Sequence, residues 1–135
     1  MKIKNVLLIE NSVLDALLIK VSLQQNGELC NIHLMEDGFE AVLHTQSLLE
    51  QGSKEVPDLI IANKDLVMIN GENILSKMEG LGNFYIPVII MTSSGDEALP
   101  LFNGQTCCII NKPLEVQEFI SIFRDIKDNW LTVVH

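Results

Sequence analysis

Short aliphatic runs alternate with longer amphipathic stretches along the whole chain. The runs occupy residues 5–9, 30–34, 58–62, 88–91 and 107–110. The third and fourth runs follow Pro57 and Pro87 and show no alternation of polar and apolar residues, which is typical of strands buried on both faces of a parallel sheet. The pattern therefore predicts an α/β fold in which right-handed connections wind one five-stranded parallel sheet doubly, with helices on both faces.

The amphipathic stretches predict helices between these strands. Ser12 can cap the first helix, and Asn26 and Gly27 are expected to stop it. A second helix is expected between Gly38 and Gly52. Apolar spacing predicts core-facing residues in the first helix (Val13, Leu14, Leu17, Leu18, Val21), the second (Ala41, Val42, Leu48, Leu49) and the last (Val116, Phe119, Ile120, Phe123, Ile126).

Two further helices are expected, of which the second should be less regular than the first. Residues 71–80 read as a regular third helix, whereas residues 96–103 predict a short or distorted fourth one, because Pro100 cannot donate a helix hydrogen bond. A chain of 135 residues fits one compact domain. We therefore expect a single domain over residues 1–135, with a short tail at 129–135.

Composition excludes several classes of partner. The net charge of −9 opposes binding to a phosphate backbone, so no direct nucleic-acid partner is expected. No apolar run approaches the roughly 20 residues that span a bilayer, and the N-terminal apolar run is too short for a signal-peptide core, so we expect no membrane contact and a cytoplasmic location. Cys30, Cys107 and Cys108 are expected to be reduced core thiols, and His33, His44 and His135 have no metal-ligand spacing.

Polar residues gather where four of the predicted strands end. They are Glu10 and Asn11 after the first strand, Asn63 after the third, Thr92 and Ser93 after the fourth, and Lys112 and Pro113 after the fifth. In open α/β sheets, ligands bind beyond the carboxyl ends of the strands. A strand order of 2-1-3-4-5 would bring these four turns together.

The segments at these turns resemble a known family. VLLIENS (6–12), PDLIIAN (57–63), NG (70–71), IPVIIMTSS (86–94) and NKP (111–113) are similar, in this order and spacing, to the receiver domains of two-component response regulators. Residues 130–134, with the Glu-Asp-Gly turn at 36–38, are similar to the small single-domain receivers that serve cyanobacterial phytochrome-type kinases. The resemblance implies a phosphorelay signalling protein, not an enzyme, whose partner is a histidine kinase or another signalling protein.

The resemblance also assigns roles to the strand-end residues. In the family, an acidic pair and an acceptor aspartate hold Mg²⁺, while a hydroxyl and a lysine bind the phosphoryl oxygens. The acidic pair corresponds to Glu10 and Asn11, the acceptor to Asn63, the hydroxyl to Thr92 and the lysine to Lys112. Two of the three carboxylates are therefore replaced by amides.

These departures predict a degenerate receiver. A neutral amide at Asn63 is a poor nucleophile and cannot form an acyl phosphate, and hard cations need anionic oxygens, so Mg²⁺ binding is expected to be weak or absent even with a backbone carbonyl from Asp65. The position of the family's switch aromatic holds Ile109. We expect no cofactor, and we expect Lys112 to pair with Glu10 or Asp65 in one fixed state.

Alternatives remain open on the sequence alone. The protein could be phosphorylated unconventionally, for instance on Asp65, or bind phosphoryl groups and Mg²⁺ without conventional chemistry. A flavodoxin-like cofactor protein or enzyme is disfavoured, because Glu10 and Asp15 would repel a flavin phosphate. Trp130 and the tail could pack on their own domain or, with the last strand and helix, form a homodimer contact.

Overall fold

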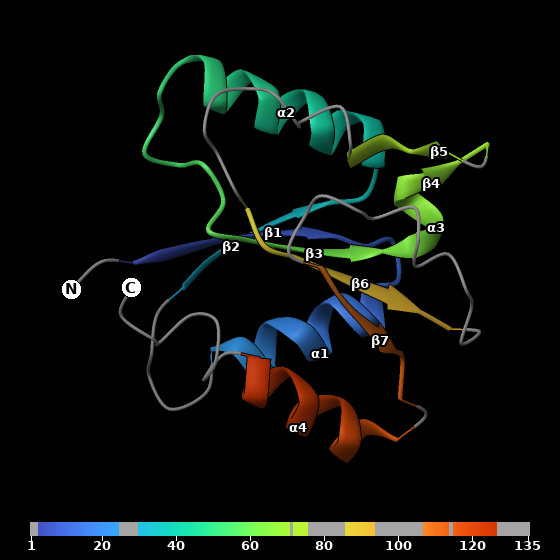
Figure 1. Ribbon diagram of the computed structural model, residues 1–135. Helices are drawn as coiled ribbons and strands as arrows, with labels where there is room; N and C mark the ends of the chain where they lie inside the picture. Colours follow the sequence, from blue (N-terminus) through green and yellow to red (C-terminus); the bar gives the residue numbers. More distant parts are fainter. Residues whose placement is uncertain are drawn as a thin grey trace.

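The fold is an open five-stranded sheet with helices on both faces, accompanied by a separate two-stranded sheet (Figure 1). The computed structural model describes residues 3–24, 30–70, 72–75, 86–93, 107–113 and 115–126. The main sheet has the order β2-β1-β3-β6-β7, and its four strand pairs are all parallel. Its strands are β1 (Lys4–Ile9), β2 (Cys30–Met35), β3 (Leu59–Asn63), β6 (Val88–Thr92) and β7 (Cys107–Asn111). The predicted fold class and strand order are confirmed.

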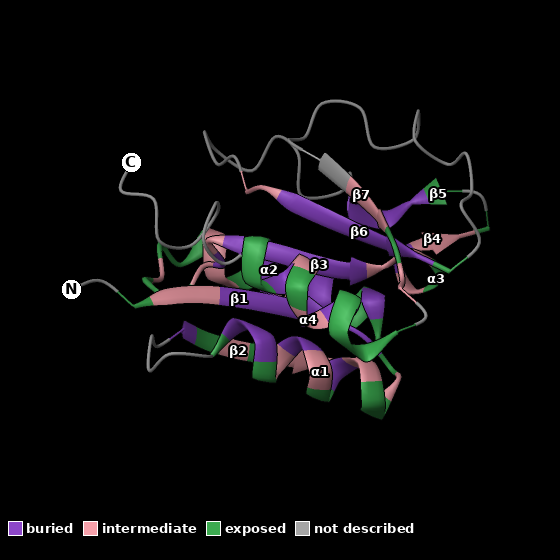
Figure 2. Ribbon diagram, turned by 90° about the horizontal axis from the view of Figure 1, so that it is seen from below, coloured by how far each residue is buried: buried purple, intermediate pink, exposed green. Residues whose placement is uncertain are grey.

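Burial along the strands explains the uninterrupted apolar runs. All five residues of β6 and the first four of β3 are buried, whereas β2 at the sheet edge alternates and is only partly covered (Figure 2). A strand covered on both faces has no side to present to water, so both sets of alternating positions must be apolar. Cys30 is a buried, reduced thiol, as predicted, and its Sγ lies 3.8 Å from the Leu23 carbonyl oxygen, while the side chains of Cys107 and Cys108 lie outside the described part.

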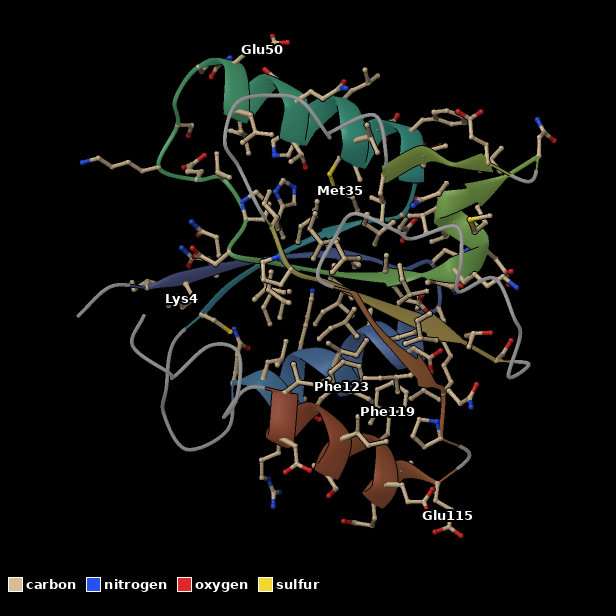
Figure 3. The ribbon with its side chains drawn as sticks, viewed as in Figure 1. Lys4, Met35, Glu50, Glu115, Phe119 and Phe123 are labelled. Atoms are coloured by element: carbon tan, nitrogen blue, oxygen red, sulfur yellow. The ribbon has the colours of Figure 1, made fainter. Side chains whose placement is uncertain are left out.

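Helices divide the core into two layers. The helices α1 (Val13–Leu23) and α4 (Val116–Ile126) pack together on one face of the sheet, and α2 (Gly38–Glu50) covers the other (Figure 1). Phe119 and Phe123 of α4 stack with ring centroids 5.1 Å apart and lie between that helix and the sheet (Figure 3). On the α2 side, the rings of His33 and His44 meet edge to face at 4.8 Å, a proximity that their sequence spacing did not indicate.

The prediction for the buried face of α1 is wrong. Val13, Leu14, Leu17 and Val21 are exposed, and the helix buries Ala16, Ile19, Ser22 and Leu23 instead; of the predicted set, Leu18 alone packs partly against the core. The helix is apolar nearly all round, so periodicity could not choose between its faces. Small residues at positions 16 and 22 allow close approach to the sheet and α4, and the Ser22 hydroxyl is satisfied by donating to the Leu18 carbonyl at 2.7 Å.

The core-facing residues predicted for α4 and α2 are confirmed in part. Phe119, Phe123 and Ile126 of α4 are buried as predicted, Ile120 is partly buried, and Val116 is exposed. Within α2, Ala41 and Val42 are buried as predicted, whereas Leu48 and Leu49 are only partly buried.

The predicted helix over residues 71–80 is wrong at residues 72–73, which form a strand, whereas residues 74–75 have 3₁₀-helical structure. Glu72–Asn73 forms β5, which pairs antiparallel with β4 (Met68–Ile69), and the short helix α3 (Lys64–Val67) precedes them. Asn70 adopts a left-handed backbone with φ 52°, which turns the chain back on itself. Residues 26–27, 76–80, 96–103 and 129–135 lie outside the described ranges, so the first helix end, the fourth helix and the tail stay predictions.

Within the ranges that the structure describes, no helix is both long and apolar enough to cross a bilayer.

Candidate functional site

The carboxyl ends of β1, β3, β6 and β7 meet at one edge of the sheet. Ile9 lies beside Ala62, Asn63 beside Met91, and Thr92 beside Asn111 in the strand register. The Lys112 amide continues this register by donating to the Thr92 carbonyl at 2.8 Å. Parallel pairing therefore brings the polar residues that follow four strands to the same edge.

An ion bridge centred on Lys112 crosses this edge. Lys112 Nζ lies 2.7 Å from Glu10 Oε1 and 2.7 Å from Asp15 Oδ2. The side chain of Glu10 is 1% exposed, that of Lys112 16% and that of Asp15 22%. The predicted pairing with Glu10 is confirmed, but the alternative partner Asp65 is exposed on α3, and Asp15 accepts the second hydrogen bond instead.

Asp15 is brought to the site by the start of α1. The Ser12 hydroxyl oxygen caps this helix by accepting from the Asp15 amide at 3.2 Å, which places Asp15 in the first turn. Carboxylates are favoured there by the partial positive charge of the helix N-terminus. Sequence reasoning considered Asp15 only as a source of repulsion for a flavin phosphate, although the Ser-x-x-Asp spacing next to a strand end signals its position.

The charges of the bridge are unbalanced. Burial by itself lowers the pKa of Lys112, but the hydrogen bonds and charges of Asp15 and Glu10 outweigh burial and raise that pKa above its ordinary value of 10.5. One ammonium therefore faces two carboxylates. Glu10 Oε2 is buried and has no hydrogen-bond partner within the described part of the chain, so the cluster retains an excess of negative charge.

Asn63 serves as a helix cap. Its Oδ1 accepts a hydrogen bond from the Asp65 amide at 3.0 Å and so caps α3. Asparagine is among the preferred residues at this position because its side-chain oxygen satisfies an otherwise unpaired amide at a helix start. The oxygen at the position of the family's phosphoacceptor is thus engaged with the local backbone.

The remaining residues of the predicted site lie around this bridge. Thr92 is buried at the end of β6 and Asn11 is exposed after β1. Ile109 is partly buried and packs against the core cluster on the α2 side of the sheet. Its aliphatic side chain fills that core position, where the resemblance implies an aromatic switch residue.

The donor set at this edge suits a resident divalent cation poorly. Glu10 Oε1 is taken by the Lys112 ammonium, and the side chains of Asn11 and Asn63 are uncharged amides. No group of three or more histidine, cysteine, aspartate or glutamate side chains in metal-binding arrangement occurs among the described residues. Mg²⁺ prefers several anionic oxygens in octahedral geometry, so no chemical step can be assigned to a metal here.

Comparison with known proteins identifies relatives of one kind. No family model matches the chain. The probable methanogenesis regulatory protein FilR2 of Methanothrix harundinacea is 26% identical, covering 93% of this chain and 83% of FilR2. Response regulator Rcp1 of Synechocystis sp. is 23% identical, covering 97% of this chain and 91% of Rcp1.

Solved structures similar to this chain also include response regulators. The phosphorylated cyanobacterial phytochrome response regulator RcpA superimposes with a TM-score of 0.80 at 22% identity, covering 99% of this chain and 98% of RcpA. A likeness of this extent shows a common fold. The edge that carries the Lys112 bridge is the carboxyl edge of the sheet, at which open α/β sheets bind ligands.

Proposed function

We propose that this chain, a receiver domain of the two-component response-regulator type, signals without being phosphorylated and acts by binding other proteins. The single observation that carries the proposal is the bridge from Lys112 to Glu10 and Asp15 at 2.7 Å each. Two of the three N–H donors of Lys112, and its charge, are already engaged by carboxylates of its own chain, which disfavours transfer of the lysine to an incoming phosphoryl group. In the natural chain, Asn11 and Asn63 add no charge at this edge that would draw a metal or a phosphoryl group to it.

The chemistry of the acceptor position supports the same reading. Phosphoryl transfer to a receiver needs a carboxylate nucleophile and a cation that neutralises the phosphoryl oxygens. Asn63 offers an amide whose oxygen caps α3, and Glu10 is the only carboxylate of the family's acidic set that remains. Neither requirement is met, and the protein is proposed to need no cofactor and to catalyse no reaction.

The partner class follows from the receiver fold. Rcp1 and RcpA are response regulators, and RcpA is named as a phytochrome regulator. A domain that keeps the fold but not the acceptor can still occupy the docking site of such a pathway. The proposed partner is accordingly a histidine kinase or another signalling protein, with a phytochrome-type kinase as the first one to examine.

Phosphorylation on Asp65 is the rival reading. Asp65 lies one residue beyond the start of α3, is exposed, and its amide is held by Asn63 Oδ1. Its carboxylate is therefore outside the cluster formed by Glu10, Asp15 and Lys112. A nucleophile in that position would lie apart from the Lys112 ammonium, which Glu10 and Asp15 hold.

Acetyl phosphate with Mg²⁺ provides a direct test, read by intact-mass spectrometry. We expect no phosphoryl adduct on the natural chain. The matched control is the double variant Asn11→Asp with Asn63→Asp, which restores the missing carboxylates and is expected to gain a Mg²⁺-dependent adduct. An adduct on the natural chain would contradict the proposal, and its location on Asp65 by peptide mapping would establish the rival.

A further inference from the structure

Two histidines that are separated in the sequence meet beside the edge strand of the sheet. His33 lies on β2 and His44 on α2, and their ring centroids are 4.8 Å apart with an angle of 74° between the ring planes. His33 is exposed and His44 is half-buried, so ions in solution can reach the pair. Within the part of the chain that the structure describes, no protein hydrogen bond engages a nitrogen of either ring. Each neutral imidazole therefore keeps a nitrogen lone pair for a ligand.

The distance between the two rings suits a shared metal ion. A zinc ion binds an imidazole nitrogen at roughly 2.0–2.1 Å. For ligand angles between a right angle and a tetrahedral one, this bond length places the centroids of two bound imidazoles roughly 4.5–5.2 Å apart. The observed 4.8 Å lies within that interval. Rotation of the rings about their side-chain bonds, without movement of β2 or α2, therefore brings one nitrogen of each ring to a common cation.

A pocket beside the pair has room for a hydrated cation. Its volume is about 330 Å³, against roughly 30 Å³ for one water molecule. His33, His44 and Glu55 line it, together with two asparagines and several apolar side chains. The asparagines are engaged with each other, since Asn31 Nδ2 donates to Asn5 Oδ1 at 3.2 Å. The two imidazoles and the Glu55 carboxylate are thus the strongest metal-ligating groups of this pocket, and no lysine or arginine is among the described residues that line it.

We propose that His33 and His44 bind a divalent first-row transition-metal ion such as Zn²⁺, with water in the remaining coordination positions. Imidazole is a preferred ligand of these ions, whereas Mg²⁺ and Ca²⁺ prefer oxygen ligands. The Glu55 carboxylate at the pocket wall attracts the cation and accepts hydrogen bonds from its waters. Because no three histidine, cysteine, aspartate or glutamate side chains of the described ranges are arranged to hold a metal, the chain supplies two ligands and the cation stays exchangeable.

Metal binding at this place links the edge strand to the helix that covers it. β2 lies at the edge of the main sheet, and α2 packs over one face of that sheet (Figure 1). A cation that binds only the folded arrangement stabilises the folded state as its concentration rises above the dissociation constant. Asn5 and Pro57 place the pocket near the amino ends of β1 and β3, away from the carboxyl edge that carries Lys112. The inference thus goes beyond the proposed function, which does not require this cation.

Calorimetric titration of the chain, prepared without a histidine tag, with Zn²⁺ tests the site. The chain has 3 histidines, so each can be replaced by glutamine in turn. We expect the natural chain to bind one Zn²⁺ ion saturably. His33→Gln and His44→Gln should each weaken binding by at least about tenfold, since even changes behind the ligands of a metal weaken its binding by roughly 10–100-fold. His135→Gln is the matched control and should bind as the natural chain does.

Proton NMR of the imidazoles in the natural chain gives a readout that does not depend on how the variants fold. Zn²⁺ should shift the ring resonances of His33 and His44 together and leave those of His135 in place. Two outcomes would overturn the inference. They are the absence of saturable Zn²⁺ binding, which leaves the ring contact as packing alone, and binding that His33→Gln and His44→Gln do not weaken, which assigns the ion to other side chains. The phosphorylation test reads the opposite end of the sheet, so each proposal can fail without the other.

Discussion

Lys112 lies between Glu10 and Asp15 in an arrangement that couples three segments of the chain. Glu10 follows β1, Asp15 lies in the first turn of α1, and Lys112 follows β7. Because Glu10 is almost fully buried, its charge depends on this ammonium for compensation. Removing one partner of a buried ion pair costs far more than the pair contributes in net terms, since it leaves a charge without a counterion.

Replacement of Lys112 by methionine should therefore destabilise the protein. We expect Lys112→Met to lower the free energy of unfolding by about 2 kcal/mol, less than for a fully buried pair because Lys112 and Asp15 retain some exposure. Urea unfolding measures the difference. Lys20→Met on α1 is the control, since Lys20 takes no part in the bridge, and equal stability of the two variants would count against a structural role for Lys112.

The raised pKa of Lys112 gives the bridge a distinctive pH dependence. A group whose pKa is higher in the folded than in the unfolded state contributes its full stability below the unfolded value and loses it as pH rises through the folded value. The contribution of Lys112 is thus complete below its ordinary pKa of 10.5 and declines above it. The stability difference between the natural chain and Lys112→Met should shrink as pH rises above 10.5; a difference that stays constant would contradict the assignment.

Close backbone contacts between elements, as well as the apolar faces of the helices, determine where the elements of this fold lie. Gly38 opens α2, and a Cβ atom built on it would collide with the backbone carbonyl oxygen of Leu66 and touch Ile74. The start of α2 thus packs directly against the α3 backbone. Glycine is needed there because no side chain fits between the two elements.

Gly38→Ala should consequently reverse the usual ranking of helix propensity. Alanine stabilises an ordinary helix position by up to about 1 kcal/mol relative to glycine, but here the clash with backbone should lower the free energy of unfolding by about 2 kcal/mol or more. Gly52→Ala provides a comparison, since a Cβ at Gly52 meets no atom and suffers only from its φ of 63°. Thermal unfolding that ranks Gly38→Ala above Gly52→Ala in stability would refute the packing argument.

Sequence patterns predicted the strands well and the helices unevenly, for physical reasons. Aliphatic runs such as residues 59–62 are typical of strands that must be covered on both faces, and turn residues separate them. The helix α1 is apolar on two faces, and only packing against the sheet and α4 decides that Ile19 is buried while Leu17 is exposed. The hairpin of β4 and β5 depends on a left-handed Asn70, which helical periodicity at residues 71–80 could not indicate.

The site was predictable as a set of positions, and its contacts were predictable only in part. Strand ends identified Glu10, Asn63, Thr92 and Lys112, because parallel strands share one carboxyl edge. The pairing of Lys112 with Asp15 required the orientation of the first turn of α1. The sequence named Glu10 and Asp65 as candidate partners of the lysine, and the tertiary structure confirms Glu10 but places Asp15 where Asp65 was expected.

At the scale of the whole molecule, the fold is that of a receiver. The sheet order is β2-β1-β3-β6-β7, and the phytochrome response regulator RcpA superimposes on 99% of the chain with a TM-score of 0.80. The acceptor amide caps a helix and the lysine closes on its own chain. The proposed function accordingly assigns partner recognition to the surface of this fold, with an output that does not depend on a phosphoryl group.

Amide-resolved NMR with Mg²⁺ and beryllofluoride, a mimic of an acyl phosphate, tests this central claim most directly. The account predicts no saturable shifts at Asn63, Thr92 or Lys112 at millimolar Mg²⁺, because the Lys112 bridge persists and no carboxylate acceptor is present. Saturable shifts that spread from Thr92 through β7 to α4 would contradict it, since they would mean that the site opens and that the phosphoryl switch still operates.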